Sequence, residues 1–255
     1  SRNCPVPAEL SIRVVPTLAE VDPAAWDACA NPKFSSPASG LADESDSGRE
    51  ALDSTLAARS DHDDPMGPLD SKLQQEPFNP FLTHAFLSSL EESGSATPRT
   101  GWAGAHILVE DAGGRLVACA PAWLKSHSQG EYVFDHGWAD AYERAGGSYY
   151  PKLQVAVPFT PVTGRRLLLA DGAGETERAA LLQGLRAVVR KAGASSIHIT
   201  FPTHAEWAAL GETGLLQRTG QQFHFFNRGY VSFEEFLGDL ASRKRKAIRK
   251  ERATA

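Results

Sequence analysis

The chain has 255 residues and a hydrophobic share of 42%, which is enough for one or two domains with a buried core. It contains no run of about eighteen apolar residues, so no membrane span is expected. Its three cysteines are scattered and lack metal-ligand spacing, which indicates reduced thiols and a cytoplasmic protein. The net charge of -5 arises in residues 31–76, which contain ten acidic and four basic residues, so the rest of the chain is close to neutral.

The N-terminal part predicts a strand at residues 11–15 and a helix that Asp22 caps and Pro23 opens. Residues 31–76 follow, rich in Ser, Ala, Gly and Asp. They lack the apolar surface that would offset their ordering entropy, so we expect a mostly mobile insertion. His62 stands among aspartates there, but a mobile acidic loop is a poor metal site and we predict no metal.

The middle of the chain alternates strands and helices, which is typical of an α/β fold. Asn79-Pro80 caps a helix that Gly94 ends, and a Gly-Gly turn joins two apolar runs into a hairpin. His106 and His198 are interpreted as hydrogen-bonded core histidines. The expected elements are the helix after Asn79, the hairpin strands 106–110 and 115–124, an irregular aromatic segment 130–163, strand 166–170, helix 175–191, strand 196–201, helix 204–210 and strand 217–227.

The last stretch predicts one helix over residues 232–252, with Ser232 and Glu235 as a capping box. Seven of its last ten residues are cations, which repel one another unless an anion is near. They are either a solvated surface or a site for phosphate, carboxylate or nucleic acid. Two rows could form the site: Arg245, Arg249 and Arg252, or Arg243, Lys246 and Lys250.

Several strings in order carry a family resemblance: Asn79-Pro-Phe-Leu-Thr-His, Tyr149-Tyr-Pro-Lys-Leu-Gln, Pro158-Phe-Thr-Pro-Val-Thr-Gly and Ser242-Arg-Lys-Arg-Lys. Residues 79–255 resemble the bacterial FemAB-like, "peptidogalycan biosynthesis" proteins. The resemblance implies a GNAT-like, mixed, mostly antiparallel sheet flanked by helices. Family members have two such domains in tandem, so we expect a first domain in 1–30 and 77–230, the insertion 31–76, and a truncated second domain opening at 231–255.

The resemblance also implies an N-acyltransferase that moves an acyl or aminoacyl group to a small or peptidic amine, such as a cell-envelope precursor. Acyl-CoA or aminoacyl-tRNA would be the donor. A GNAT domain usually holds the coenzyme A pyrophosphate at a basic residue and a glycine turn before a helix. Here Leu169 takes the basic position, and Asp171, Glu175 and Glu177 add negative charge. We therefore predict that this domain does not bind coenzyme A in the standard way.

The segment 125–163 is the predicted site, because aromatic rings mixed with acids and bases suit a ligand cleft. Acyl transfer to an amine needs a base, for which the candidates are His127, Glu131 and Asp135. The expected substrate-binding residues are Trp138, Tyr149, Tyr150, Lys152 and His224, and the expected anion-binding residues are Arg243, Arg245, Lys246, Arg249 and Lys250. Two alternatives remain open: a packed irregular lobe without a site, and a non-catalytic anion- or RNA-binding module.

Overall fold

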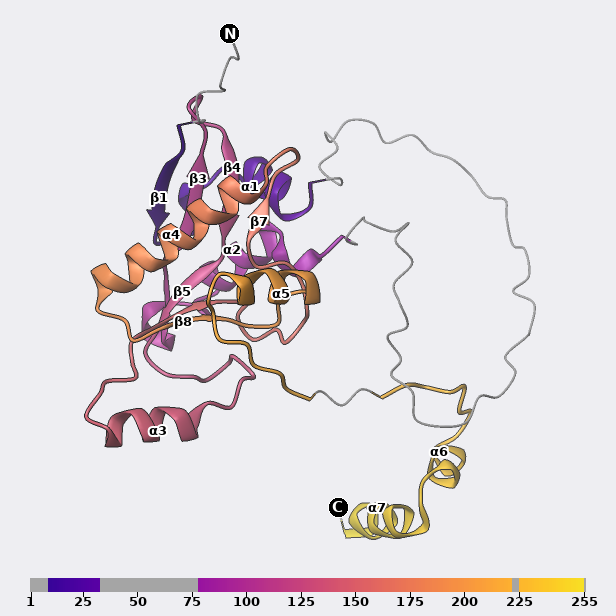
Figure 1. The fold of residues 1–255 in the computed structure, drawn as a ribbon. Coiled ribbons are helices and arrows are strands. Elements are labelled where there is room, and N and C mark those ends of the chain that lie inside the picture. Colours follow the sequence, from indigo (N-terminus) through magenta and orange to yellow (C-terminus); the bar gives the residue numbers. More distant parts are fainter. Residues whose placement is uncertain (1–8, 33–77, 222–224, 255) are drawn as a thin grey trace, which may run out of the picture. The chain divides into compact units, whose positions relative to one another are not determined.

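The computed structural model describes residues 9–32, 78–221 and 225–254 (Figure 1). The chain divides into two compact units, residues 1–213 and 214–255. The predicted insertion falls almost entirely outside the described residues, as do His62 and His224. Among the helices of the described ranges, none combines the length and the apolar character needed to cross a membrane.

The larger unit is built on two four-stranded sheets that share one long bent hairpin. One sheet has the order β1-β3-β4-β7 and the other β2-β5-β6-β8. β2 runs directly into β3, and β4 into β5, with a break at Ala105 on one arm and at Pro121 on the other. Proline has no backbone N–H for the ladder, so a break there is expected. The strands are β1 (Ser11–Val15), β2 (Trp102–Gly104), β3 (His106–Glu110), β4 (Leu116–Ala120), β5 (Ala122–Lys125), β6 (Lys152–Val155), β7 (Leu168–Leu169) and β8 (Ile197–Ile199).

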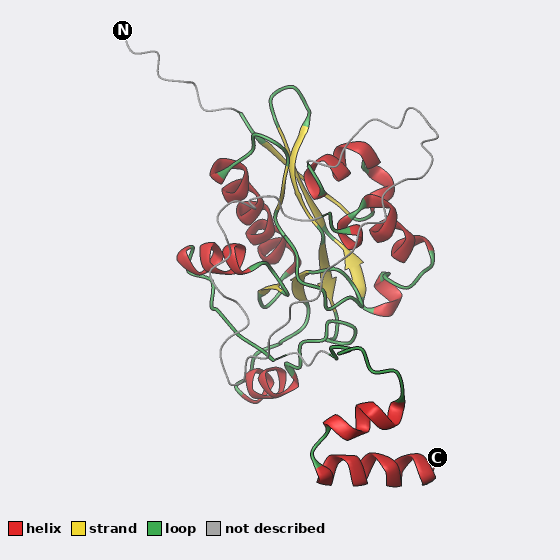
Figure 2. Ribbon diagram, turned by 90° about the vertical axis from the view of Figure 1, so that its right-hand side faces the viewer, coloured by secondary structure: helices red, strands yellow, loops and turns green. Residues whose placement is uncertain are grey.

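Among the strands of the described ranges, only the pair β6 and β8 is parallel, and the other pairs are antiparallel. Helices lie on both sides of the strands (Figure 2). The helices of this unit are α1 (Pro23–Ala30), α2 (His84–Glu92), α3 (His136–Arg144), α4 (Glu175–Ala192) and α5 (His204–Glu212). The prediction of a mixed, mostly antiparallel sheet with flanking helices is confirmed.

The core of this unit follows from strand alternation. One face of the first sheet packs against α1 and α2 through Trp26, Leu87, Leu108 and other buried apolar side chains. The opposite face receives α4, which approaches so closely that Gly184 has no room for a side chain beside Ile107. Helix starts have the predicted caps: Asp22 accepts from the Ala25 amide, for example, and so fixes the first turn of α1.

Several predicted elements differ from the structure. The segment 130–163, predicted to be irregular, contains α3 and β6. Asn79-Pro80 caps a short 3₁₀ helix (Pro80–Leu82), and Thr83 then caps α2. The predicted strand 217–227 is wrong, because its described residues are exposed and have no neighbouring strand to bond. The predicted strand 166–170 shrinks to β7, which has only two residues paired with β4.

The smaller unit contains two helices where one was predicted, α6 (Phe233–Asp239) and α7 (Ser242–Thr254). Leu240 between them has an extended backbone, which ends α6. The carboxylate of Asp239 accepts bonds from the Tyr230 hydroxyl and from Arg228, so the end of α6 is tied to the loop before it. Gly238 and Asp239 also disfavour a continuous helix at this point.

A hydrogen-bonded clasp joins Asn31 to Asn79. The Asn31 side chain donates to the carbonyl of Asn79 at 3.2 Å and accepts from its amide at 2.8 Å. Asn31 is 5% exposed, so these bonds are sheltered from water. The clasp therefore fixes the two points of the core between which the acidic segment runs.

Candidate functional site

The strongest candidate site lies on one face of the second sheet. Strand register pairs Lys125 of β5 with Lys152 of β6, so two ammonium groups project on the same side. Like charges directly opposite each other destabilise a sheet. Both lysines are also 0% exposed, so their charges must be compensated inside the protein.

Lys152 is compensated by two carboxylates from the segment between β5 and α3. Its ammonium group donates to Asp135 Oδ2 at 2.6 Å and to Glu131 Oε2 at 2.7 Å. It donates a third bond to Ser128 Oγ at 2.9 Å, which uses all three of its protons. The Tyr149 hydroxyl donates to Asp135 Oδ2 at 2.7 Å, and Ser128 shares a 2.7 Å hydrogen bond with the Tyr150 hydroxyl. We call Ser128, Glu131, Asp135, Tyr149, Tyr150 and Lys152 the lysine cluster.

The backbone around Glu131 has unusual conformations on both sides. Gly130 has φ of 80°, and a side chain there would collide with the Phe159 ring. The backbone amide of Phe159 also donates to the Gly130 carbonyl at 3.0 Å. Tyr132 has φ of 56°, which is rare for a residue with a side chain. Such conformations concentrate at functional sites. Here they turn the Glu131 carboxylate inward while the Tyr132 ring is 55% exposed.

Asp135 occupies the N-cap position of α3 but does not cap the helix with its side chain. An aspartate at this position usually accepts from the first amides of the helix. The Asp135 side chain makes no such bond and points to Lys152 and Tyr149 instead. The helix start is thus left without its side-chain cap in favour of the lysine cluster.

Two carboxylate oxygens of the cluster have no partner. Glu131 Oε1 and Asp135 Oδ1 are buried and accept no hydrogen bond within the described residues. A buried acceptor without a donor is costly, and native structures seldom leave one unexplained. These oxygens are suited to a ligand that brings N–H donors, such as an ammonium group.

The two carboxylates differ in acidity although they share Lys152. Burial alone would raise the pKa of Asp135, but the hydrogen bonds from Lys152 and Tyr149, together with the positive charge of Lys152, lower it to about 2. Burial raises the pKa of Glu131, and the attraction of Lys152 does not fully offset this. Asp135 therefore stays ionised, while Glu131 is the more basic group.

Lys125 completes the site and was not singled out from sequence. Its ammonium group lies 3.4 Å from the centre of the Trp102 ring and donates to the Gln129 carbonyl at 3.2 Å. Burial lowers the pKa of Lys125 to about 7, against the attraction of Glu131. The residue was missed because only the β5–β6 register places it opposite Lys152.

The structure brings together five of the seven site residues predicted from segment 125–163: Glu131, Asp135, Tyr149, Tyr150 and Lys152. His127 lies on the same loop, but its ring fills the space beside Gly101, and its Nδ1 accepts from the Gln129 amide. Trp138 is 54% exposed on α3. His106 is fully buried and bonds Glu91, as expected of a core histidine. His198 bonds Ser196 but is only half-buried, so it is not a core residue.

A second buried pair, Arg166 and Glu206, was also missed. The Glu206 carboxylate accepts from the backbone amides of Arg166 and Leu167 at 2.7 to 3.1 Å. The Arg166 guanidinium donates to backbone carbonyls, including Thr200 at 2.8 Å after β8. Because these bonds go to backbone groups, the pair pins the chain after residue 160 onto α5 and acts as a structural clamp.

The N-terminus of α4 is already occupied by its own acid. Glu177 accepts from the Gly174 amide at 2.7 Å, and this bond stabilises the helix start. That amide is one a pyrophosphate would need. Poor binding of coenzyme A at this turn stays a prediction.

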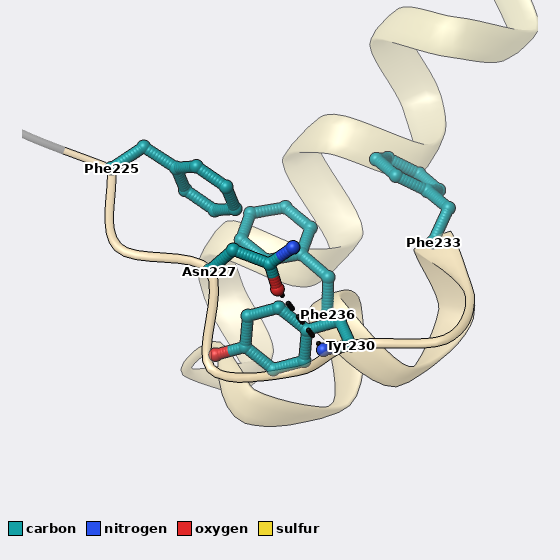
Figure 3. A pocket seen from close by; sticks show the side chains of 5 residues that line it. All are labelled: Phe225, Asn227, Tyr230, Phe233 and Phe236. Atoms are coloured by element: carbon teal, nitrogen blue, oxygen red, sulfur yellow. Dashed lines mark hydrogen bonds between the residues drawn. The ribbon is translucent and has the colours of Figure 1, made fainter. Parts of the chain in front are cut away.

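In the smaller unit, an aromatic recess lies beside α6. Phe225, Asn227, Tyr230, Phe233 and Phe236 line it, and the Phe236 ring contacts the other three rings (Figure 3). Asn227 turns its side-chain oxygen back to the Tyr230 amide. The recess has no charged lining residue, so it does not attract an anion. The cations of this unit gather on α7 instead.

Comparison with known proteins places the sequence in a family. Residues 69–255 match the FemAB-like family, described as "Peptidogalycan biosysnthesis/recognition". Among solved structures, a Trypanosoma brucei acetyltransferase is similar, with a TM-score of 0.39 and 11% identity over 86% of this chain and 100% of that one. No curated protein matches the sequence. Because the matched region is most of the 255 residues, the chain belongs to the FemAB-like family.

Proposed function

We propose that this chain is an N-acyltransferase, which moves an acyl or aminoacyl group from an activated donor to an amine acceptor. Membership of the FemAB-like family supports this reaction class and a peptidic or cell-envelope acceptor. The observation that carries the proposal is the unpartnered, buried oxygen of Glu131 beside Lys152. We assign the lysine cluster as the place where the acceptor amine is bound and deprotonated.

The chemistry follows from the groups present. The acceptor ammonium donates a hydrogen bond to Glu131 Oε1 and then gives up one proton to that carboxylate. The free amine attacks the donor carbonyl, a C–N bond forms, and the bond from the carbonyl to the leaving thiolate or ribose oxygen breaks. The proton on Glu131 passes to the leaving group. After the attack the nitrogen carries one proton more than an amide nitrogen, and it releases this second proton through the Glu131 carboxylate to water, so the carboxylate returns to its starting state.

Glu131 suits the role of base better than the other two predicted candidates. Asp135 accepts from both Lys152 and Tyr149 through one oxygen, and its low pKa makes it a weak base. Its task is to hold the Lys152 ammonium group in place. His127 has one ring nitrogen engaged by a backbone amide and lies against Gly101. Burial lowers its pKa as well.

The acceptor must reach a site that is closed in this structure. The side chains of Lys152 and Glu131 are both 0% exposed, so binding requires the segment 126–135 to move outward. The exposed rings of Tyr132 and Phe134 lie on that segment, and Trp138 and Tyr142 follow on α3. They offer an apolar surface on which the body of a peptidic acceptor can rest.

The test compares Glu131→Gln with the matched variant Glu143→Gln on the exposed side of α3. Acetyl-CoA and aminoacyl-tRNA serve as donors, each with a panel of amino acids and peptides as acceptors. We expect Glu131→Gln to lower kcat by about 10²- to 10⁴-fold with unchanged donor affinity, and Glu143→Gln to be silent. Turnover in Glu131→Gln within a factor of about three of wild type would contradict the assignment.

A second readout does not depend on the donor. The side-chain carboxyl ¹³C shift of Glu131, assigned by its loss in the variant, should titrate above the ordinary value of 4.5. A titration at or below that value would remove Glu131 as the base. Donor binding without turnover across the whole panel would favour the alternative, a non-catalytic module.

A further inference from the structure

We infer that one face of α7, formed by Arg243, Lys246 and Lys250, binds a ligand that carries several phosphate groups in a row. We call these three residues the basic row. This inference concerns the smaller unit only, and it does not rest on the proposed acyl transfer.

The structure separates the two rows that sequence left as alternatives. Arg249 forms an ion pair with Glu234 of α6, and the Arg252 guanidinium lies 4.3 Å from the centre of the Phe233 ring. Arg245 is half-buried, as is Ile248. This side of α7 therefore packs against α6, and its cations hold the two helices together.

The basic row lies on the other side of the helix. Its three residues are exposed, and none forms an ion pair or hydrogen bond through its side chain with another described residue. Positions i, i+3 and i+7 share one face, and with a rise of 1.5 Å per residue they span roughly 10 Å along the axis. The chain thus presents an aligned set of three uncompensated cations.

The helix offers little internal compensation for this charge. The first turn of α7 contains no acid, although the positive end of the helix dipole adds to the repulsion there. Glu251 is the one acid among residues 242–254, against seven cations. Like charges three and four residues apart disfavour the helix. An anion on the basic row would relieve this repulsion.

The length and chemistry of the row indicate the class of ligand. A single carboxylate or phosphate reaches one neighbouring pair, whereas the full row requires anionic groups spread over roughly 10 Å. Lysine is a strong phosphate binder as a point charge, and arginine adds a bidentate fork. A short polyphosphate and a nucleic-acid backbone share this chemistry.

A membrane surface fits the row less well. Helices that lie on lipid place large apolar residues next to their cations and insert them between the headgroups. The small residues near the basic row are Ala247, Ala253 and Thr254, and the larger Ile248 is half-buried on the side toward α6. The basic row therefore lacks the apolar anchor that lipid binding requires.

The experiment compares the triple variant Arg243→Gln/Lys246→Gln/Lys250→Gln with Arg186→Gln/Arg190→Gln/Lys191→Gln on the exposed side of α4. Both variants lose three positive charges, so a general change of net charge affects them equally. The probes are tripolyphosphate, followed by calorimetry, and a labelled single-stranded RNA of roughly a dozen nucleotides, followed by anisotropy. Circular dichroism checks that α7 remains helical.

We expect wild type and the α4 variant to bind at least one probe, more weakly at about 200 mM than at about 50 mM salt, and the basic-row variant to bind at least about tenfold more weakly. RNA binding alone assigns a nucleic-acid backbone, and equal binding of both probes assigns a short phosphate chain. Either result supports the inference. It is overturned if neither probe binds, if the two variants behave alike, or if only anionic phospholipid vesicles bind.

Discussion

Glu131 and Asp135 contact the same ammonium group, yet their pKa values move in opposite directions. The difference lies in the donors around them. Asp135 receives bonds from Lys152 and Tyr149 on a single oxygen, and hydrogen bonding to the charged form favours it. Glu131 receives one bond, which does not outweigh its burial. One carboxylate therefore holds the site together, and the other remains available for proton transfer.

Removal of the Asp135 charge should weaken the fold in a way that depends on pH. Its folded-state pKa of about 2 lies below the ordinary value of 3.8, so it stabilises the protein above the unfolded value and stops doing so as pH falls through about 2. We expect Asp135→Asn to lower the unfolding free energy by about 3 kcal/mol near neutral pH, because Lys152 keeps only one carboxylate partner. Urea titrations should show this deficit shrinking between about pH 5 and pH 2.

The exposed Asp140 on α3 provides the matched control. Asp140→Asn should change the unfolding free energy by less than about 0.5 kcal/mol at any of these pH values. A deficit for Asp135→Asn that stays constant from neutral to acidic pH would show that its carboxylate is not held in the ionised form.

Residue types in the 130–152 segment were enough to name Glu131, Asp135 and Lys152 as site residues, but not their roles. Those roles depend on which oxygen faces which donor, and this is decided by the turn at Gly130 and Tyr132. Ser128 and Lys125 were missed for the same reason. Lys125 is an ordinary lysine at a strand end until strand register places it opposite Lys152, and Ser128 is an ordinary loop serine until the loop brings it to the Lys152 ammonium group.

At the scale of elements, α4 shows how a local preference is overruled by packing. Glycine inside a helix costs about 1 kcal/mol relative to alanine, so Gly184→Ala would ordinarily stabilise α4. A Cβ atom at this position would lie 2.7 Å from Ile107 Cγ2 and 3.0 Å from Ile12 Cγ2. We expect Gly184→Ala to destabilise the larger unit by about 1–2 kcal/mol, because the strands beneath must shift. Thermal unfolding measures this directly.

Gly137 is the matched control, since it also lies in a helix and has open space around it. Gly137→Ala should leave the melting temperature unchanged or raise it slightly. A stabilised Gly184→Ala variant would mean that α4 and β3 are not packed as closely as described.

Elements with strong local signals were predicted, whereas those that depend on distant partners were not. The caps at Asp22 and Ser232 and the turn at residues 111–114 follow from nearby residues alone. β6 was missed because it is short and fully buried, and its parallel partner β8 begins more than forty residues later. The break between α6 and α7 was missed because it rests on Tyr230, outside both helices.

At the scale of the whole chain, the segment between the two clasp residues should be dispensable for folding. Replacing residues 35–75 with a short Gly/Ser bridge shortens the loop and slightly lowers the entropic cost of closing it. We expect the melting temperature to stay within about 3 °C of the full chain, measured by differential scanning calorimetry. A large loss would show that this segment packs on the core.

A companion variant separates the clasp from the segment. Asn31→Ala removes two sheltered hydrogen bonds to Asn79 and should lower the unfolding free energy by about 1–3 kcal/mol with or without residues 35–75. An equal melting temperature for Asn31→Ala and wild type in both backgrounds would mean that the clasp contributes nothing.

The clasp also has a consequence for how this protein can change in length. Asn31 and Asn79 bond each other directly, so the distance between the two ends of the intervening chain does not depend on its length. We therefore expect insertions and deletions between these two residues to leave α1, α2 and the sheets in place. The segment between them is equally the natural place to open the chain for a circular permutant, or to carry a guest domain.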